Sequence, residues 1–172
     1  MKTLYLLRHA KSDWAGPVRA DFDRPLNRRG RAAAKRMGRL MARRGLVPAL
    51  VLCSAAARTR ETWMLAAPAF EENLKVRTLR TLYLASPETL LTTLTRLPES
   101  TPSVLILGHN PGLEELASQL AGPGSKKAAL KRLRNKFPSG ALAVFEIDTN
   151  RWAKVGEAPP RLAGFFRPRD AD

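Results

Sequence analysis

Both histidines of this 172-residue chain come one residue after a short apolar run, and an arginine stands beside the first of them. Residues 4–7 (LYLL) lead into Arg8 and His9, and residues 104–107 (VLIL) lead into Gly108 and His109. An imidazole can attack an electrophile or transfer a proton near neutral pH, and a guanidinium binds phosphate or carboxylate through paired donors. These residue types predict an anion-binding site with nucleophilic or acid–base chemistry.

A third apolar run, residues 49–53 (ALVLC), ends in Ser54 and a short turn toward Arg58 and Arg60. Unbroken apolar runs are typical of strands buried on both faces of a parallel sheet. Ligands bind at the carboxyl ends of such strands in open α/β sheets. We therefore expect the histidines and an arginine to meet at one sheet edge. Two ordinary core or surface histidines are the alternative, but chance would rarely place both at strand ends.

Two of these strand ends lead into predicted helix N-termini, which favour anions through free backbone N–H groups. Arg58 falls in the first turn of a helix predicted over about 55–67, where a phosphate would meet both the guanidinium and these groups. A structural salt bridge is the alternative role for Arg58, and Arg60, on another helix face, is the weaker candidate. His109 lies just before a helix that Asn110 and Pro111 open and Gly122 ends.

The alternation of strand and helix predicts one domain, residues 1–172, with a three-layer α/β/α fold and a mainly parallel central sheet. A C-terminal antiparallel hairpin is expected at one sheet edge. The other predicted elements are a helix from Asn27 to Gly45, a short strand within 76–84, a helix from Ser86 to Pro98, a strand at 141–147 and its return strand at 152–155.

Three stretches carry charges whose role the sequence leaves open. In the loop at 12–26, the charged residues either line the mouth of the site, pair with each other or are solvated: Arg19, Asp21, Asp23 and Arg24. The helix after Asn27 has a basic exposed face without acids, which is solvated or forms an interaction surface. The segment 122–140 is expected to be the least regular, as a mobile basic flap, a docking surface or a solvated loop with a helical turn. Its cations are Lys126, Lys127, Lys131, Arg132, Arg134 and Lys136.

The composition limits the class of protein. The chain has 30 lysines and arginines against 15 acids, a net charge of +15 that attracts anionic partners. Cys53, the single cysteine, excludes an internal disulfide and is expected to be an inert core thiol. No apolar stretch has the length of a membrane span or a signal-peptide core, so a cytoplasmic location is expected. The protein is also expected to be a monomer without a membrane partner.

The order of these motifs resembles the histidine phosphatase superfamily, which includes the phosphoglycerate mutases. The matching segments are RHA at 8–10, SAAARTRET at 54–62, YLASPETLL at 83–91 and VLILGHNPGLEELA at 104–117. The short length and the ending FFRPR at 165–169 are similar to the small phosphohistidine phosphatase branch. Ala10 replaces the usual glycine of the RHG motif, which is a mild departure.

The resemblance implies phosphoryl transfer through a covalent phosphohistidine on His9. Arg8, Arg58 and His109 would surround the phosphoryl group, with Ser12 and Asn110 as further substrate-binding candidates. By resemblance, the region of Glu88 supplies an acidic residue in many members, although the helix dipole explains a glutamate there equally well. No metal and no cofactor are expected.

The expected substrate is phosphohistidine on a signalling or phosphotransfer protein. No clear general acid stands among the motif residues. A site with little acid assistance suits an imidazole leaving group better than an alkoxide, which needs a proton as it departs. A phosphatase of small phosphorylated metabolites is the alternative. A phosphate- or nucleic-acid-binding module on the same fold is the non-enzymatic alternative, although a pure binder would have no need of His9 as a nucleophile.

Overall fold

The computed structural model describes residues 1–17 and 19–171 and contains one six-stranded sheet in the order β3-β2-β4-β1-β5-β6. Strands β1 to β4 run parallel, β5 is antiparallel to β1, and β6 is antiparallel to β5. The predicted mainly parallel sheet with an antiparallel C-terminal hairpin is confirmed. The strands are β1 (Lys2–Arg8), β2 (Leu50–Ser54), β3 (Lys75–Leu79), β4 (Ser103–Gly108), β5 (Leu142–Ile147) and β6 (Arg161–Phe166).

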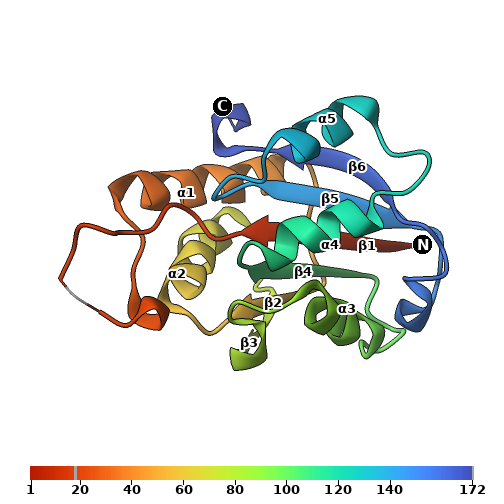
Figure 1. The fold of residues 1–172 in the computed structure, drawn as a ribbon, viewed down its shortest axis with the longest axis horizontal. Coiled ribbons are helices and arrows are strands. Elements are labelled where there is room, and N and C mark those ends of the chain that lie inside the picture. Colours follow the sequence, from red (N-terminus) through yellow and green to blue (C-terminus); the bar gives the residue numbers. More distant parts are fainter. Residues whose placement is uncertain (18, 172) are drawn as a thin grey trace.

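Helices cover both faces of the sheet, as the three-layer prediction requires (Figure 1). One face packs against α1 (Arg28–Arg43) and α2 (Ala57–Ala66), and the other against α3 (Pro87–Thr95), α4 (Gly112–Leu120) and α5 (Lys127–Asn135). Alternate residues of β1 enter the two cores, which is why its apolar run has no polar gaps. No helix in the described ranges has both the length and the apolar character to cross a membrane.

The helix ends follow the predicted local chemistry. The Asn27 side chain accepts a hydrogen bond from the Gly30 amide at 2.8 Å at the start of α1. Gly45 has φ +67° just after α1, a conformation that other residues adopt only with strain. Ser86 caps α3 by accepting from the Thr89 amide at 3.2 Å. These caps confirm the boundaries predicted from the sequence.

The predicted return strand at 152–155 is wrong. This stretch contains a 3-10 turn, Trp152–Lys154, and the strand that pairs with β5 is β6. Trp152 and Val155 lie three residues apart, so one helical turn buries both in the same core, and the indole donates to the Thr101 carbonyl at 2.7 Å. Trp152 and Val155 are therefore buried by a helical turn, and no strand is needed to place both side chains in the core.

The segment 122–140 is also more regular than predicted. Nine of its residues form α5, which packs against β6 through the buried side chains of Ala129 and Leu133. These two side chains lie four residues apart and so share one helix face. The cations around them are carried by a helix packed on the sheet.

Helices α1 and α2 cross at a point where only glycine fits. A Cβ atom built on Gly38 would lie 2.4 Å from the Ala66 carbonyl oxygen of α2. The neighbouring atom is backbone, so it cannot rotate away as a side chain can. The close approach holds α2, and with it Arg58, against α1.

We predict that Gly38→Ala lowers the free energy of unfolding by about 1–3 kcal/mol, because the two helices must separate to admit the methyl group. Gly156→Ala is the matched control, since a Cβ there meets no atom within 4 Å. Urea unfolding of both variants checks this. Equal stability of the two variants would contradict the close packing.

Candidate active site

The carboxyl ends of β1, β2 and β4 open into one cavity of about 510 Å³. Strand β1 brings Arg8 and His9, and His109 follows β4. Arg58, in the first turn of α2 after β2, lies almost fully buried at the same edge. Of the residues predicted from the sequence, the cavity lining includes Arg8, His9, Ser12, Arg58, His109 and Asn110.

The hydrogen bonds of His9 define which of its ring nitrogens carries the proton. Its Nδ1 lies 2.7 Å from the Ala10 carbonyl oxygen, which can only accept, so Nδ1 carries the proton. The Nε–H of Arg58 donates to His9 Nε2 at 3.3 Å, which requires a lone pair on that nitrogen. Nε2 is therefore the unprotonated nitrogen of His9. Because the Nδ1 proton is held by the backbone carbonyl of residue 10, alanine serves there as well as glycine does.

The backbone around His9 is held from three sides. The His9 amide donates to the Gly108 carbonyl of β4 at 3.1 Å, and the Gly140 amide donates to the His9 carbonyl at 2.9 Å. The Ala10 amide donates to the Thr62 hydroxyl of α2 at 3.0 Å. Since β4, α2 and the segment before β5 all contribute, the imidazole is positioned by the fold as a whole.

Three nitrogen atoms of residues that line this cavity are buried and have no hydrogen-bond partner in the described part of the chain: Arg8 Nε, Arg24 Nε and His109 Nδ1. The Nε2 atom of His109 is 2.7 Å from the Ser54 hydroxyl, so this contact orients the second ring, whose centroid lies 5.3 Å from that of His9. Arg8 is anchored through Nη1 to the Phe137 carbonyl at 3.0 Å. Buried polar nitrogens without partners are costly, so these side chains keep part of their hydrogen-bonding capacity unused at a cost in stability.

Both imidazoles are neutral at physiological pH. Burial lowers the pKa of His9 to about 3, outweighing the Ala10 hydrogen bond, and electrostatic repulsion between its protonated form and His109, Arg58 and Arg8 acts in the same direction as burial. Burial and the Arg58 charge likewise lower the pKa of His109 to about 3. A neutral His9 is the form that can act as a nucleophile.

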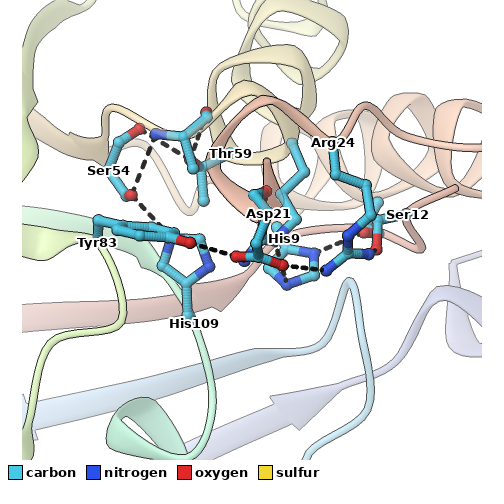
Figure 2. A network of polar contacts seen from close by, with 11 residues as sticks. His9, Ser12, Asp21, Arg24, Ser54, Thr59, Tyr83 and His109 are labelled. Atoms are coloured by element: carbon cyan, nitrogen blue, oxygen red, sulfur yellow. Dashed lines mark hydrogen bonds and ion pairs between the residues drawn. The ribbon is translucent and has the colours of Figure 1, made fainter. Parts of the chain in front are cut away.

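Asp21, in the segment after β1, lines the same cavity as the two histidines (Figure 2). Its Oδ2 accepts from Arg58 at 3.0 Å and from the Tyr83 hydroxyl, and its Oδ1 accepts from Arg24 at 3.0 Å. Burial alone would raise the pKa of Asp21, but the hydrogen bonds from Tyr83 and Arg24 and the charge of Arg58 outweigh it and hold the pKa far below its usual value. Asp21 is thus ionised, and Arg24 also donates to the Ser12 hydroxyl.

Two predicted candidates lie apart from this group. Glu88, at the start of α3, is exposed and is not among the residues that line the cavity. Arg60 is exposed and donates to the Ala55 carbonyl at 3.0 Å. Asn110 does line the cavity, and its amide nitrogen donates to the Phe137 carbonyl at 3.0 Å.

Sequence reasoning placed Asp21 and Arg24 either at the mouth of the site or in a mutual pair, and the structure shows both. It missed Ser54 and Tyr83 as partners of the site. Ser54 had a signal, since it directly ends a buried strand. Tyr83 had none, because its contact with Asp21 joins positions 62 residues apart in a loop and a 3-10 turn. Cys53 is buried, and burial raises its thiol pKa to about 12, as expected of an inert core cysteine.

Several known proteins resemble this chain in sequence and in fold. A family model described as "Histidine phosphatase superfamily (branch 1)" matches residues 4–83. An uncharacterised protein of Mycobacterium tuberculosis is 37% identical over 168 residues, covering 95% of this chain and all of that protein. The crystal structure of a candidate phosphohistidine phosphatase, SixA of Agrobacterium tumefaciens, is 34% identical and covers 97% of this chain and 99% of that one, with a TM-score of 0.80.

A structure of the protein histidine phosphatase SixA complexed with tungstate covers 99% of both chains with a TM-score of 0.79. At 19% identity that likeness concerns the fold alone. The Mycobacterium tuberculosis and Agrobacterium tumefaciens proteins are more than 30% identical over nearly the whole chain, and this level of identity shows membership of a family. This chain belongs to the histidine phosphatase superfamily, in its SixA-like branch.

Proposed function

We propose that this chain is a metal-independent phosphatase that removes the phosphoryl group from phosphohistidine on a protein, through a covalent phosphohistidine on His9. Membership of the superfamily supports phosphatase activity in general. The observation that carries the mechanism is the unprotonated Nε2 of His9, which lies in a cavity lined by arginines.

In the first step His9 Nε2 attacks phosphorus, a P–N bond forms, and the bond from phosphorus to the substrate nitrogen breaks. The leaving imidazole keeps the electron pair and takes a proton from solvent. Arg8, Arg58 and His109 surround the transferring oxygens, and the charges of the two guanidinium groups offset the negative charge there. Water then attacks phosphorus, the P–N bond to His9 breaks, and inorganic phosphate leaves.

The choice of phosphohistidine as substrate follows from the state of Asp21. A phosphate ester departs as an alkoxide and needs a proton from a general acid, whereas an imidazole leaving group needs less assistance. Asp21 is ionised and tied to Arg58, Arg24 and Tyr83, so it is a poor proton donor. A site of this kind favours the N-phosphorylated substrate.

A protein substrate is supported by the rim of the cavity. Trp14 and Leu84 line it, and these residues are 78% and 52% exposed. Exposed aromatic and aliphatic side chains beside a polar site are typical anchors for a protein partner. The rim therefore fits a phosphohistidine presented on a protein surface.

A phosphatase of small phosphorylated metabolites is the alternative, and one assay separates the two. Phosphate release is measured in EDTA with a histidine-phosphorylated phosphotransfer protein and with an aryl phosphate, for wild type and His9→Ala. We expect kcat/KM to favour the phosphoprotein by at least a hundredfold, and His9→Ala to be inactive on both. A preference for the aryl phosphate would support the alternative, and activity that needs a divalent metal would contradict the mechanism.

Arg58→Ala should lower kcat/KM by roughly a hundredfold, because one charge-assisted contact to the transferring group is lost. Arg60→Ala is the matched control, since it removes the same charge from an exposed side chain that lies two residues further along the chain. Steady-state kinetics of both variants check this, with thermal unfolding to show that each remains folded. Similar losses would mean that Arg58 acts only through net charge.

The low pKa values of the histidines predict that both rings stay neutral in acid. An unfolded chain takes up protons near pH 6.5, whereas the folded protein resists them until pH approaches 3. Imidazole ¹⁵N spectra at pH 5.5 should show two neutral rings, with the His9 proton on Nδ1. Titration of the His9 ring between pH 6 and 7 in the folded protein would refute this electrostatic description.

A further inference from the structure

A second cavity, of about 540 Å³, lies beside the catalytic cavity. Lys136 and Pro138 line both, so the two spaces share a wall. The second cavity lies between α1, the end of α5 and the C-terminal turn Pro168–Asp170, which come together at one side of the molecule (Figure 1). We call it the arginine groove, and the cations that line it are Arg29, Arg36, Arg132, Lys136, Arg167 and Arg169.

Two of these cations are fixed in place. Arg167 donates to both oxygens of Asp170, at 2.9 and 3.0 Å, and Arg132 donates to the Phe165 carbonyl at 3.0 Å and reaches Asp170 at 3.5 Å. The Arg167 hydrogen bond lowers the pKa of Asp170 to about 2, and this outweighs the opposing effect of burial. Asp170 is therefore ionised, and among the described residues it is the one carboxylate that forms ion pairs with cations of the groove.

The other four cations form no ion pair with a carboxylate in residues 1–17 and 19–171. Arg29 and Arg169 are exposed, and the Nε of Arg36 is buried without a partner in that part of the chain. Like charges held this close repel one another unless an anion lies between them. The groove thus has a strong excess of positive charge that its own acids do not neutralise.

The spacing of the cations indicates an extended ligand. Arg29 and Arg36 lie on the same face of α1, two turns apart, which is about 10 Å along the helix axis. Cations that bind one phosphate converge on a point, whereas these are distributed along a wall. Guanidinium groups pair with carboxylates through two parallel hydrogen bonds. Several carboxylates along one segment match this arrangement better than a single oxyanion does.

Single-stranded nucleic acid is a less suitable ligand. Proteins that bind it combine a basic groove with aromatic side chains on which the bases stack. None of the described residues that line the groove is aromatic. Carboxylates need only the guanidinium groups.

We propose that the arginine groove docks an acidic segment of the phosphoprotein whose phosphohistidine enters the catalytic cavity. The proposal rests on the proposed function for the identity of that protein, but binding of the acidic segment needs no catalysis. The shared wall at Lys136 and Pro138 lets one protein surface occupy both cavities. The groove adds affinity and selects acidic partners through charge complementarity.

The segment 122–140 provides a matched control. Of its cations, Arg132 and Lys136 line the groove, while Lys126, just before α5, and Lys127 and Lys131 of α5 are exposed and are not among the lining residues. Replacing these three lysines by glutamine removes the same charge as replacing Arg29, Arg36 and Arg169. Any difference between the two triple variants comes from the position of the charges and is independent of net charge.

The test measures the binding of dye-labelled octaglutamate by fluorescence anisotropy in low salt. The groove variant Arg29→Gln/Arg36→Gln/Arg169→Gln should bind about tenfold more weakly than wild type, and the lysine variant within twofold of it. The ratio of kcat/KM for an acidic histidine-phosphorylated protein to that for phosphoramidate should fall about tenfold in the groove variant only. Arg29→Gln/Arg169→Gln, limited to exposed residues, should shift both measurements in the same direction.

Equal weakening in both triple variants would assign binding to net charge and overturn the proposal, as would no weakening in either. Tighter, groove-dependent binding of oligodeoxythymidine of equal charge would identify a nucleic-acid site and overturn it as well. Groove-dependent octaglutamate binding without hydrolysis of any phosphohistidine protein would support the groove and contradict the proposed function. The two proposals therefore fail separately.

Discussion

The parallel pairing of β1 with β4 is the constraint on which the site depends. In this register Arg8 lies opposite Gly108, so the residues that follow, His9 and His109, leave the sheet at the same edge. Their ring centroids come within 5.3 Å although the residues are 100 positions apart. Because side chains alternate along a strand, a shift of one residue would turn Arg8 to the other face. The apolar residues of β1, buried in two different cores, oppose such a shift.

The second requirement is electrostatic. Burial keeps both imidazoles neutral and lowers the pKa of the Arg8 guanidinium, while Asp21 offsets the charge of Arg58. A buried guanidinium without a counter-charge is costly, so this ion pair stabilises the folded state of the free protein. The guanidinium donors of Arg8 and Arg58 line the cavity and are anchored by backbone carbonyl groups. Such donors are positioned before the substrate arrives, which is the condition for electrostatic stabilisation of a transition state.

The sequence predicted strands β1 to β5, most helices and the convergence of six site residues, because unbroken apolar runs define buried parallel strands. It failed at 152–155 and within 122–140, where apolar residues three or four apart fit a helical turn and tertiary packing decides. It did not identify Tyr83 as a partner of Asp21, since a contact between two loops leaves no periodic signal. The arginine groove could not be predicted from the sequence either. Its cations come from three segments that become neighbours only when the C-terminus packs beside α1 and α5.

The most direct test of the account is the chemical identity of the phosphoenzyme. Wild-type protein is mixed with labelled phosphohistidine substrate, quenched within one turnover, digested and analysed by mass spectrometry at alkaline pH. The account predicts a phosphoryl group on the peptide that contains His9, stable in base and lost in acid. A label on a serine such as Ser12, or on Cys53, would contradict it.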